Sequence, residues 1–235
     1  MTPYSSIETV YTRDKDTNLL NFGEIRCIEN TCINTWTISE KIDGTNIRVI
    51  VTKGGIDIRG RTDKAELNHD LLKAILAIFP SHERLLEYFT EYRGQELANE
   101  WSICFYGEGY GAGIQAGGRY SEMKRFRCFD LLLGESWWTD DDEMRRVCDE
   151  LSIPTAPWLA VTPNLPKTRE ELAEIIPFSH VAYEDRGVGD VPAEGIVAKP
   201  LHVLLNRHKD RVIWKLTFRE FKENSAVEGG EDLSN

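Results

Sequence analysis

The sequence lacks the long apolar segments and the leader by which proteins cross or enter membranes. Its longest apolar stretch, Leu71 to Phe79, is interrupted by Lys73 and is far shorter than the roughly 20 residues that a membrane-spanning helix needs. The N-terminus has neither the basic start nor the apolar run of a secretion signal. We therefore expect an intracellular, cytoplasmic protein that does not bind a membrane.

The cysteines show no pairing pattern, and basic residues are outnumbered by acidic ones, 28 to 39. The five cysteines are odd in number and show no repeated pair spacing, so the sequence indicates neither a disulfide framework nor a structural zinc site. The net charge of −11 argues against nonspecific coating of nucleic acid, although a local basic groove is compatible with it. With 41% hydrophobic residues, the chain can fill a substantial core. We expect a folded, globular protein with reduced thiols.

Segments rich in β-branched and aromatic residues predict strands at residues 34–38, 45–52, 101–106, 126–133, 195–199 and 211–216. The strands alternate with helices in an irregular order, which favours an α+β fold with largely antiparallel sheets. Residues 222–235 are polar, acidic and rich in glycine. The sequence therefore predicts one domain at residues 1–221, followed by a flexible acidic tail.

Apolar residues at helical spacing predict the helices. The first would bury one face, made of Leu71, Leu72, Ile75, Leu76 and Phe79. Pro80 would end this helix, and Ser81 would cap a second helix that runs to Tyr92. Thr139 is the expected N-cap of a third helix, and Thr168 that of a fourth, with a capping box to the residue three positions on.

The segment from Ser39 to Asn46 contains the residues most suggestive of chemistry. Lys41 leaves one predicted strand, crosses a turn at Gly44 and leads into the next strand. A lysine acts as a nucleophile through its neutral amine, and nearby cations or desolvation lower its pKa toward neutrality. The alternative interpretation is a hairpin turn with solvated charges, because motifs this short arise often.

A glycine-rich loop, Gly107 to Gln115, follows a strand and contains Glu108. Such a loop lets the backbone approach a nucleotide closely. A dinucleotide-binding fold would require a helix directly after the glycines, and the further glycines that follow here argue against it. A phosphate-binding G-x-x-x-x-G-K-[ST] loop is absent from the sequence.

Four residues outside these motifs add to the pattern. Glu194 begins a predicted strand that ends at Lys199, and Lys215 interrupts an apolar strand. Phe129 could stack on a base or belong to the core, and Lys215 could simply extend to solvent. Together with the two motifs, these residues provide an amine, carboxylates, an aromatic ring and cations, which nucleotidyl transfer requires.

The covalent nucleotidyltransferases (ATP-dependent DNA ligases, RNA ligases and GTP-dependent mRNA capping enzymes) carry a similar ordered set of motifs. Here the set is Lys41-x-Asp43-Gly44, Gly107-Glu108, Phe129-Asp130, Glu194-Gly195 and Lys215, and the resemblance runs from about Glu40 to Phe221. In its details, this set of motifs resembles that of the RNA ligase 2-like and RNA-editing ligase branch. The implied fold is an α+β nucleotidyltransferase (ATP-grasp-like) domain of two mainly antiparallel sheets flanked by helices, without an OB-fold domain.

The resemblance also implies a role for each matching residue. The implied catalytic residues are Lys41, Glu194, Lys215 and Lys199. ATP would be bound by Glu40, Lys41, Asn46, Arg61, Glu108, Phe129, Lys199 and Lys215. Mg²⁺ or Mn²⁺ would be held by Glu194 and Glu108. One departure is Thr217, which stands where the family usually has a second lysine, with Arg219 as a candidate substitute.

The implied reaction joins RNA 5′-phosphate and 3′-OH ends through a lysyl-AMP intermediate, and we expect a monomer. RNA would be bound by Gln115 and by the cations Arg119, Lys124, Arg125 and Arg127, with a second basic cluster at Arg207, His208, Lys209 and Arg211. Solvated surface charge is the alternative interpretation of both clusters. The rival functions are a DNA nick-sealing ligase and a non-catalytic nucleotide or RNA-binding module.

Overall fold

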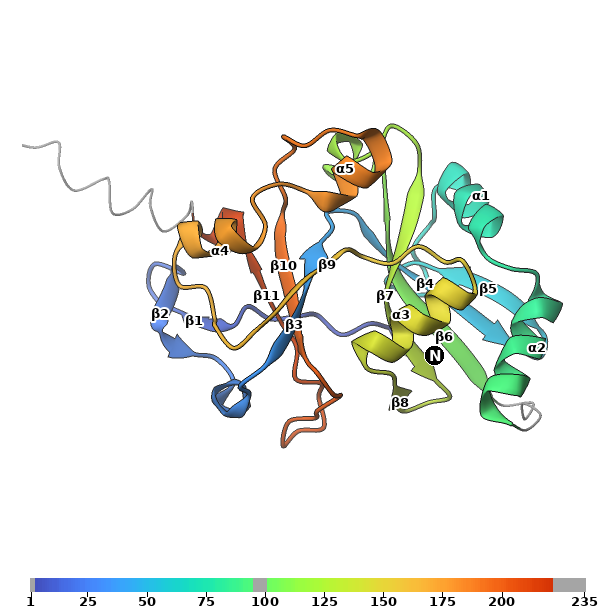
Figure 1. Cartoon of the computed structure of the whole chain (residues 1–235), viewed down its shortest axis with the longest axis horizontal. Coiled ribbons are helices and arrows are strands. Elements are labelled where there is room, and N and C mark those ends of the chain that lie inside the picture. The colour runs from blue at the N-terminus through green and yellow to red at the C-terminus, as the bar shows by residue number, and fades with distance from the viewer. Residues whose placement is uncertain (1–2, 95–100, 222–235) are drawn as a thin grey trace, which may run out of the picture. The chain divides into compact units, whose positions relative to one another are not determined.

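The computed structural model describes residues 3–94 and 101–221, and it divides the chain into two compact units (Figure 1). Unit 1 comprises Met1–Ser5 and Asp43–Ala156, and unit 2 comprises Ser6–Ile42 and Pro157–Asn235. The region predicted as one domain thus contains two compact units, each with its own sheet and core. The predicted tail at 222–235 lies outside the described residues.

Unit 1 contains a five-stranded antiparallel sheet in the order β5-β4-β6-β7-β8. Its strands are β4 (Thr45–Thr52), β5 (Gly55–Arg59), β6 (Ser102–Tyr110), β7 (Arg125–Leu133) and β8 (Trp137–Trp138). Alternation along β4 sends Ile47, Val49 and Val51 into a buried apolar core. The intervening residues, among them Asn46 and Arg48, point to the other face.

Three helices cover the apolar face of this sheet: α1 (His69–Ile78), α2 (His82–Arg93) and α3 (Asp141–Glu150). A 3₁₀ turn, η2 (Gly117–Arg119), lies in the glycine-rich loop. The helices bury Leu71 and Ile75 of α1 and Val147 of α3 against the strands. Leu76, which was predicted on the same face of α1, is instead 58% exposed, so the buried face of this helix is narrower than predicted.

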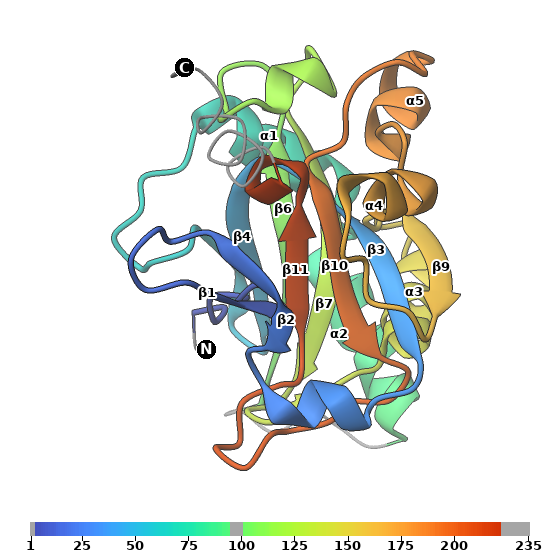
Figure 2. The ribbon, with the colours of Figure 1, turned by 90° about the vertical axis from the view of Figure 1, so that its left-hand side faces the viewer.

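Unit 2 contains a four-stranded antiparallel sheet in the order β11-β10-β3-β9, whose strands lie side by side in Figure 2. They are β3 (Trp36–Lys41), β9 (Trp158–Thr162), β10 (Gly195–Pro200) and β11 (Trp214–Thr217). A separate ribbon pairs β1 (Tyr11–Arg13) with β2 (Leu20–Ile25). The core includes Trp36 and Trp214, whose rings meet edge to face at 5.5 Å.

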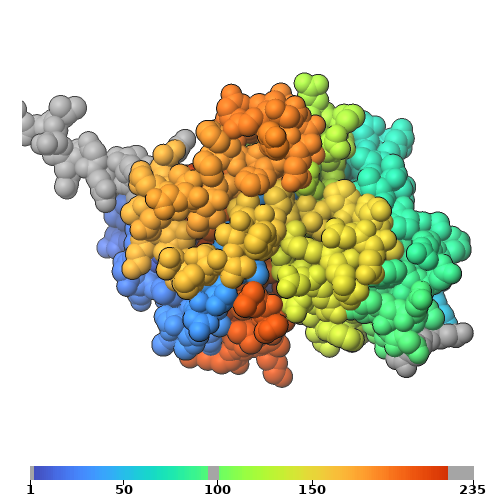
Figure 3. All heavy atoms as spheres, in the orientation of Figure 1, coloured from blue at the N-terminus to red at the C-terminus, as the bar shows by residue number. Residues whose placement is uncertain are grey.

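The helices of unit 2 are short. They are η1 (Ile28–Cys32), α4 (Arg169–Ile175) and α5 (His180–Arg186), and Figure 3 shows the α4–α5 segment, coloured orange, on the surface of the unit. Ser179 caps α5 by accepting the Ala182 N–H. Leu172 of α4 and Val181 of α5 are fully buried. Both helices therefore cover apolar side chains of this unit.

The predicted strands are all present, with shifted ends. β3 begins at Trp36 rather than at residue 34, and β11 begins at Trp214 rather than at residue 211. The ribbon β1–β2, the strands β5 and β9, and helix α5 were not predicted, because they are short and carry weak apolar periodicity. All pairs of named strands are antiparallel, which confirms an α+β fold of two mainly antiparallel sheets flanked by helices.

The predicted N-caps are single residues, so each can be compared directly with the structure. Ser81 and Thr168 cap α2 and α4 as predicted, each accepting a backbone N–H of the first turn. The capping box at Thr168 is modified, since Glu171 accepts the N–H of Lys167 instead of that of the cap residue. For α3 the prediction was wrong by one residue, because Thr139 donates its hydroxyl to a strand carbonyl and Asp140 is the cap.

Replacing Asp140 with Ala should lower the free energy of unfolding by ~1 kcal/mol, because the first turn of α3 loses its acceptor for the Glu143 N–H. The measurement is urea unfolding followed by circular dichroism. Asp149→Ala, at an exposed position of the same helix, is the matched control and should change stability by less than about 0.5 kcal/mol. Equal losses in the two variants would contradict the assignment of the cap.

None of the helices within residues 3–94 and 101–221 is long and apolar enough to cross a membrane.

Candidate active site

The lysines predicted for catalysis share one face of the unit 2 sheet. Residues directly opposite each other in an antiparallel sheet point to the same side, as do alternate residues along one strand. Gly195 of β10 lies opposite Lys41, and Val197 lies opposite Lys215. Lys199 is two positions beyond Val197 on the same strand. The pairing of β3, β10 and β11 therefore gathers three cations on the face that is turned away from the core.

Lys41 forms an ion pair with Glu194 on this face. The distance from Lys41 Nζ to Glu194 Oε2 is 2.7 Å, and the two side chains are 24% and 23% exposed. Gly195 makes this possible, because a Cβ at this position would lie 2.2 Å from the carbonyl oxygen of Leu216. Any other residue would push β11 away and disturb the neighbouring carboxylate. The candidate nucleophile and the candidate metal ligand are thus in direct contact.

The departure from the family pattern at Thr217 has a structural counterpart. Thr217 is buried and donates both its backbone N–H and its hydroxyl to Glu220 Oε2, at 2.8 and 3.2 Å. The other oxygen of Glu220 accepts the guanidinium of Arg13 at 2.8 Å. Glu220 and Arg13, which is distant in the sequence, therefore lie beside the position at which a second lysine was expected. Arg219 stays a prediction as the substitute.

Glu40, a predicted ATP-binding residue, lies on the opposite face of β3 from Lys41. Its carboxylate is 2% exposed and accepts hydrogen bonds from the Ser179 hydroxyl and the Val181 N–H, at 2.5 and 3.0 Å. Burial raises the pKa of the Glu40 carboxyl, and these hydrogen bonds oppose that effect. The carboxylate holds the first turn of α5 in place, so the structure does not bring it together with the three lysines.

In unit 1, the predicted ATP-binding residues Asn46 and Glu108 are direct cross-strand partners on β4 and β6. They therefore share the face that is not covered by α1 and α2. The Oδ1 atom of Asn46 is buried and has no hydrogen-bond partner among the described residues. A buried acceptor without a donor is costly, and a bound ligand or ion would satisfy it.

Phe129 occupies a β-bulge of β7. The register shifts there, since Tyr106 pairs with Asp130 while Gly107 pairs with Cys128, and Phe129 is the extra residue. Its half-buried ring meets the ring of Tyr4 edge to face at 5.1 Å. Stacking of Phe129 on adenine stays a prediction, and the observed neighbours are aromatic.

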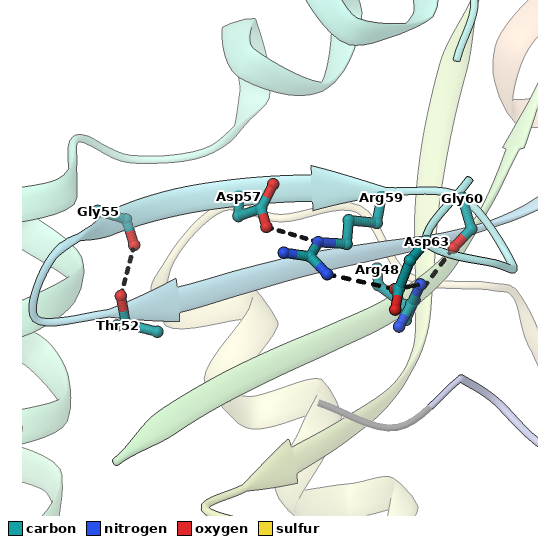
Figure 4. Close-up of polar contacts among 7 residues, drawn as sticks. All are labelled: Arg48, Thr52, Gly55, Asp57, Arg59, Gly60 and Asp63. Atoms are coloured by element: carbon teal, nitrogen blue, oxygen red, sulfur yellow. Dashed lines mark hydrogen bonds and ion pairs between the residues drawn. The ribbon is translucent and has the colours of Figure 1, made fainter. Parts of the chain in front are cut away.

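Arg61 is exposed and follows β5 in the sequence. Figure 4 shows Gly60 and Asp63, which lie on either side of it in the same loop. The two sides of this loop are bound to the buried Arg48 of β4. Arg48 Nε donates to the Gly60 carbonyl at 3.0 Å, and its Nη2 lies 2.7 Å from Asp63 Oδ1. The residue that was predicted to contact the nucleotide therefore lies in a loop that is bound to Arg48. This role of Arg48 was not predicted from the sequence.

The loop that carries the predicted RNA-binding residues returns toward the lysine motif. Arg119 lies 3.5 Å from Asp43 and packs over the ring of Tyr120. Gln115 is exposed and adopts a left-handed backbone conformation with φ of 45°. Arg125 and Lys124 are partly exposed at the start of β7. The four predicted residues thus lie just before η2, at its end and at the start of β7.

Arg127, which was assigned to the same basic cluster, is buried within unit 1. Its guanidinium donates to the Tyr110 hydroxyl at 2.8 Å and to the Thr155 carbonyl at 3.3 Å. Arg127 therefore joins three segments of the unit rather than adding to its surface charge. The second cluster is different, because Arg207, His208 and Lys209 are exposed in the loop between β10 and β11.

Gly44 of the lysine motif is required by a close approach between strands. A Cβ at this position would lie 2.3 Å from the carbonyl oxygen of Gly109 in β6. Gly44 is therefore packed closely against β6. The strands β3 and β4 on either side of this turn belong to different sheets, so they do not form a hairpin. Lys41 itself belongs to unit 2, so the motif spans the boundary between the units.

Four further residues beside the predicted site were not identified from the sequence. Arg48 and Asp63 contact each other at the loop that contains Arg61, Ser179 contacts Glu40, and Glu220 contacts Thr217. One signal was available, because Arg48 is a single cation among the apolar residues of β4. The other three residues each have a partner that is distant in the sequence, namely Arg48 for Asp63, Glu40 for Ser179 and Arg13 for Glu220.

Solved structures of an RNA ligase from Naegleria gruberi are similar to this chain. A mutant with AMP and Mn has a TM-score of 0.62 at 16% identity and covers 98% of this chain and 59% of its own. A mutant with ATP and Mn has a TM-score of 0.61 at 14% identity, with coverages of 98% and 59%. The same ligase with PPi gives 0.59 at 16% identity, with coverages of 99% and 59%.

At such identities the likeness shows a shared fold, and the chain spans about three-fifths of the length of these structures. A comparison with curated proteins gives no match. The sequence model of the RNA ligase family matches residues 34–217, which is well over half of the chain and includes Lys41, Glu108, Glu194 and Lys215. The chain belongs to the RNA ligase family.

Proposed function

We propose that this chain catalyses ATP-dependent joining of RNA through a covalent lysyl-AMP intermediate. The observation that carries the proposal is the 2.7 Å pair of Lys41 and Glu194, on a sheet face that also presents Lys199 and Lys215. Membership of the RNA ligase family supports the reaction class. The alternatives are sealing of DNA nicks and nucleotide or RNA binding without catalysis.

In the first step, Lys41 Nζ forms a bond to the α-phosphorus of ATP, and the bond from this phosphorus to the β-phosphate oxygen breaks. Pyrophosphate leaves, and the neutral amine gives up one proton, so that the nitrogen keeps one hydrogen in the lysyl-AMP. Attack requires the neutral amine of the lysine. Glu194 provides an acceptor 2.7 Å from the nitrogen for a departing proton.

Lys199 and Lys215 would stabilise the negative charge that develops on the phosphate oxygens. Their fixed position on one sheet face means that little reorganisation is required as the charge moves. Both side chains are partly or largely shielded from water, which strengthens their interaction with an anion. This role depends on charge and position, so neutral substitutions should affect the rate more than the fold.

The residues also fit a divalent cation that is held together with substrate. Within the described parts of the chain, no three His, Cys, Asp or Glu residues form a group that could hold a metal ion. Mg²⁺ commonly uses one or two protein carboxylates, with the remaining ligands from phosphate and water. Glu194 is the carboxylate that we propose for Mg²⁺ or Mn²⁺, and Glu108 stays a second prediction. A bound cation would stabilise charge on the phosphate oxygens.

In the second step, an oxygen of the RNA 5′-phosphate attacks the adenylate phosphorus, and the bond to Lys41 breaks. In the third step, a 3′-OH attacks the activated 5′-phosphate, and AMP leaves. We propose that Gln115, Arg119, Lys124 and Arg125 contact the strand. In a chain with a net charge of −11, such local cations provide the attraction for phosphate.

We further propose a monomer in a reducing, intracellular environment. The free thiols of the five cysteines support the reducing environment. The choice of ATP over GTP rests on the resemblance to ligases rather than capping enzymes.

A nicked duplex tests the reaction and its substrate. With ATP and Mg²⁺, we expect a nick with an RNA 3′-OH strand to be sealed at least about tenfold faster than the same nick with a DNA 3′-OH strand, because the 2′-OH distinguishes the two. GTP should not replace ATP. Sealing of the DNA nick at an equal or higher rate would favour the DNA ligase alternative. Binding without sealing or covalent labelling would favour the non-catalytic module.

A further inference from the structure

Arg48 is the most deeply buried cation of unit 1 for which contacts are described. It lies in the middle of β4, its side chain is 0% exposed, and its direct partners across the sheet are Tyr106 of β6 and Arg59 of β5. Burying a guanidinium is costly unless hydrogen bonds and an opposite charge compensate. The groups that compensate Arg48 therefore show what the side chain holds in place.

Those groups lie in the loop after β5 (Figure 4). Arg48 Nε donates to the carbonyl of Gly60 at 3.0 Å, and Nη2 pairs with Asp63 Oδ1 at 2.7 Å. Asp63 is itself 60% exposed, so the guanidinium fixes an otherwise solvated loop side chain. The hydrogen bond from Arg48 is the largest of the effects that lower the pKa of the Asp63 carboxyl.

Arg61 lies between the two anchored residues, Gly60 and Asp63. A second hydrogen bond closes the same loop, from the Ala65 N–H to the Thr62 carbonyl at 3.1 Å. The backbone of Arg61 is therefore held on both sides, although its own side chain is exposed. Arg59 adds a weaker and more exposed support, with Nη1 at 3.3 Å from Asp63 and Nε at 2.6 Å from Asp57.

We propose that Arg48 is a positioning residue, which holds the loop of Arg61 so that this side chain can contact the nucleotide. This proposal rests on the proposed function, because the contact between Arg61 and the nucleotide is part of that function. The new element is a role in ATP binding for Arg48, a buried strand residue. A lysine is not equivalent to Arg48, because its single nitrogen lacks the two separate donors, Nε and Nη2, that reach Gly60 and Asp63 from one rigid planar group.

The first test is Asp63→Asn, which keeps Arg48 and the shape of the loop but removes the charge that anchors it. Lysine adenylylation is followed as a function of ATP concentration. We expect the ATP concentration for half-maximal rate to rise ~10-fold with little change in the maximal rate, because a misplaced Arg61 weakens binding. Asp57→Asn, which removes only the other partner of Arg59, is the matched control and should leave both constants unchanged.

A double-mutant cycle asks whether the anchor acts through Arg61. In an Arg61→Ala background, Asp63→Asn should have no further effect on the ATP dependence, and Arg48→Met should behave in the same way. Circular dichroism and urea unfolding show whether each variant is folded. An equal effect of Asp63→Asn with and without Arg61 would overturn the proposal, since the anchor would then act by another route.

Trypsin cleavage after Arg61 provides a readout that does not require activity. In Asp63→Asn the released loop should be cut at least about tenfold faster than in Asp57→Asn or in the unmodified protein, because cleavage follows local opening. Equal cleavage would overturn the anchoring itself. If the unmodified protein is not labelled by ATP while the cleavage difference is present, the proposed function fails and the anchor stands.

Discussion

Lys41→Ala is expected to abolish covalent labelling of the chain by α-labelled ATP, to below about 1% of the unmodified level, because no other group in the sequence has the same predicted role. Lys41 ends β3, and its side chain is 24% exposed, so its removal leaves no cavity in the core. Unfolding by urea should therefore change little. The measurement is denaturing electrophoresis after incubation with labelled ATP and a divalent cation.

Two further variants make this result specific. Lys41→Arg keeps the positive charge beside Glu194 but cannot act as the nucleophile under these conditions, so it should also fail to label. Lys15→Ala removes an exposed lysine from the same unit and should label normally. Labelling that persists in Lys41→Ala would remove this residue as the nucleophile and leave the ion pair with Glu194 as a structural contact.

Glu194→Gln and Lys215→Ala are each expected to slow adenylylation at least about 100-fold, because each removes one charge that would stabilise the transition state. Glutamine retains the shape of Glu194 and can still accept a hydrogen bond from Lys41, so the change isolates the charge. Lys215 lies on the polar face of β11, between the core residues Trp214 and Leu216. Its truncation should leave the packing of these neighbours intact.

The rate is measured in a single turnover with ATP in excess and without RNA, so that only the first step is followed. Lys167→Ala, at an exposed lysine before α4, is the matched control for Lys215→Ala and should retain the normal rate. Near-normal rates in Glu194→Gln or Lys215→Ala, in variants shown to be folded, would assign those residues a structural role. A loss confined to Glu194→Gln would indicate that the lysine face tolerates the loss of one cation.

Much of the architecture was predictable because the signals are local. The alternation of apolar residues in β4, the aromatic and leucine residues of β7 and the β-branched residues of β10 each lie within ten residues. The N-caps Ser81 and Thr168 precede their helices directly. Short elements such as β5, β9 and α5 escaped prediction because three to seven residues carry too little periodicity. Leu76 was misassigned because helical spacing alone does not decide how wide the buried face is.

The candidate site was predictable as a set of residue types in a certain order, whereas its geometry was not. Lys41 and Glu194 are 153 positions apart, and nothing near either residue indicates that they touch. It was equally impossible to predict from the sequence that Glu40 lies on the opposite face of β3 from Lys41. The burial of Arg127 was not predictable either. In each case the partner is a residue far along the chain.

By itself, the sequence determined that this chain forms an α+β fold and carries the ordered motifs of a nucleotidyltransferase, because strand alternation, caps and short motifs are local properties. Only the tertiary structure decided that Lys41, Lys199 and Lys215 share one face, and that Arg48 anchors the loop of Arg61. The register between strands selects these neighbours. A shift of one residue would turn every side chain to the other face, and packing of the apolar core is what prevents that shift.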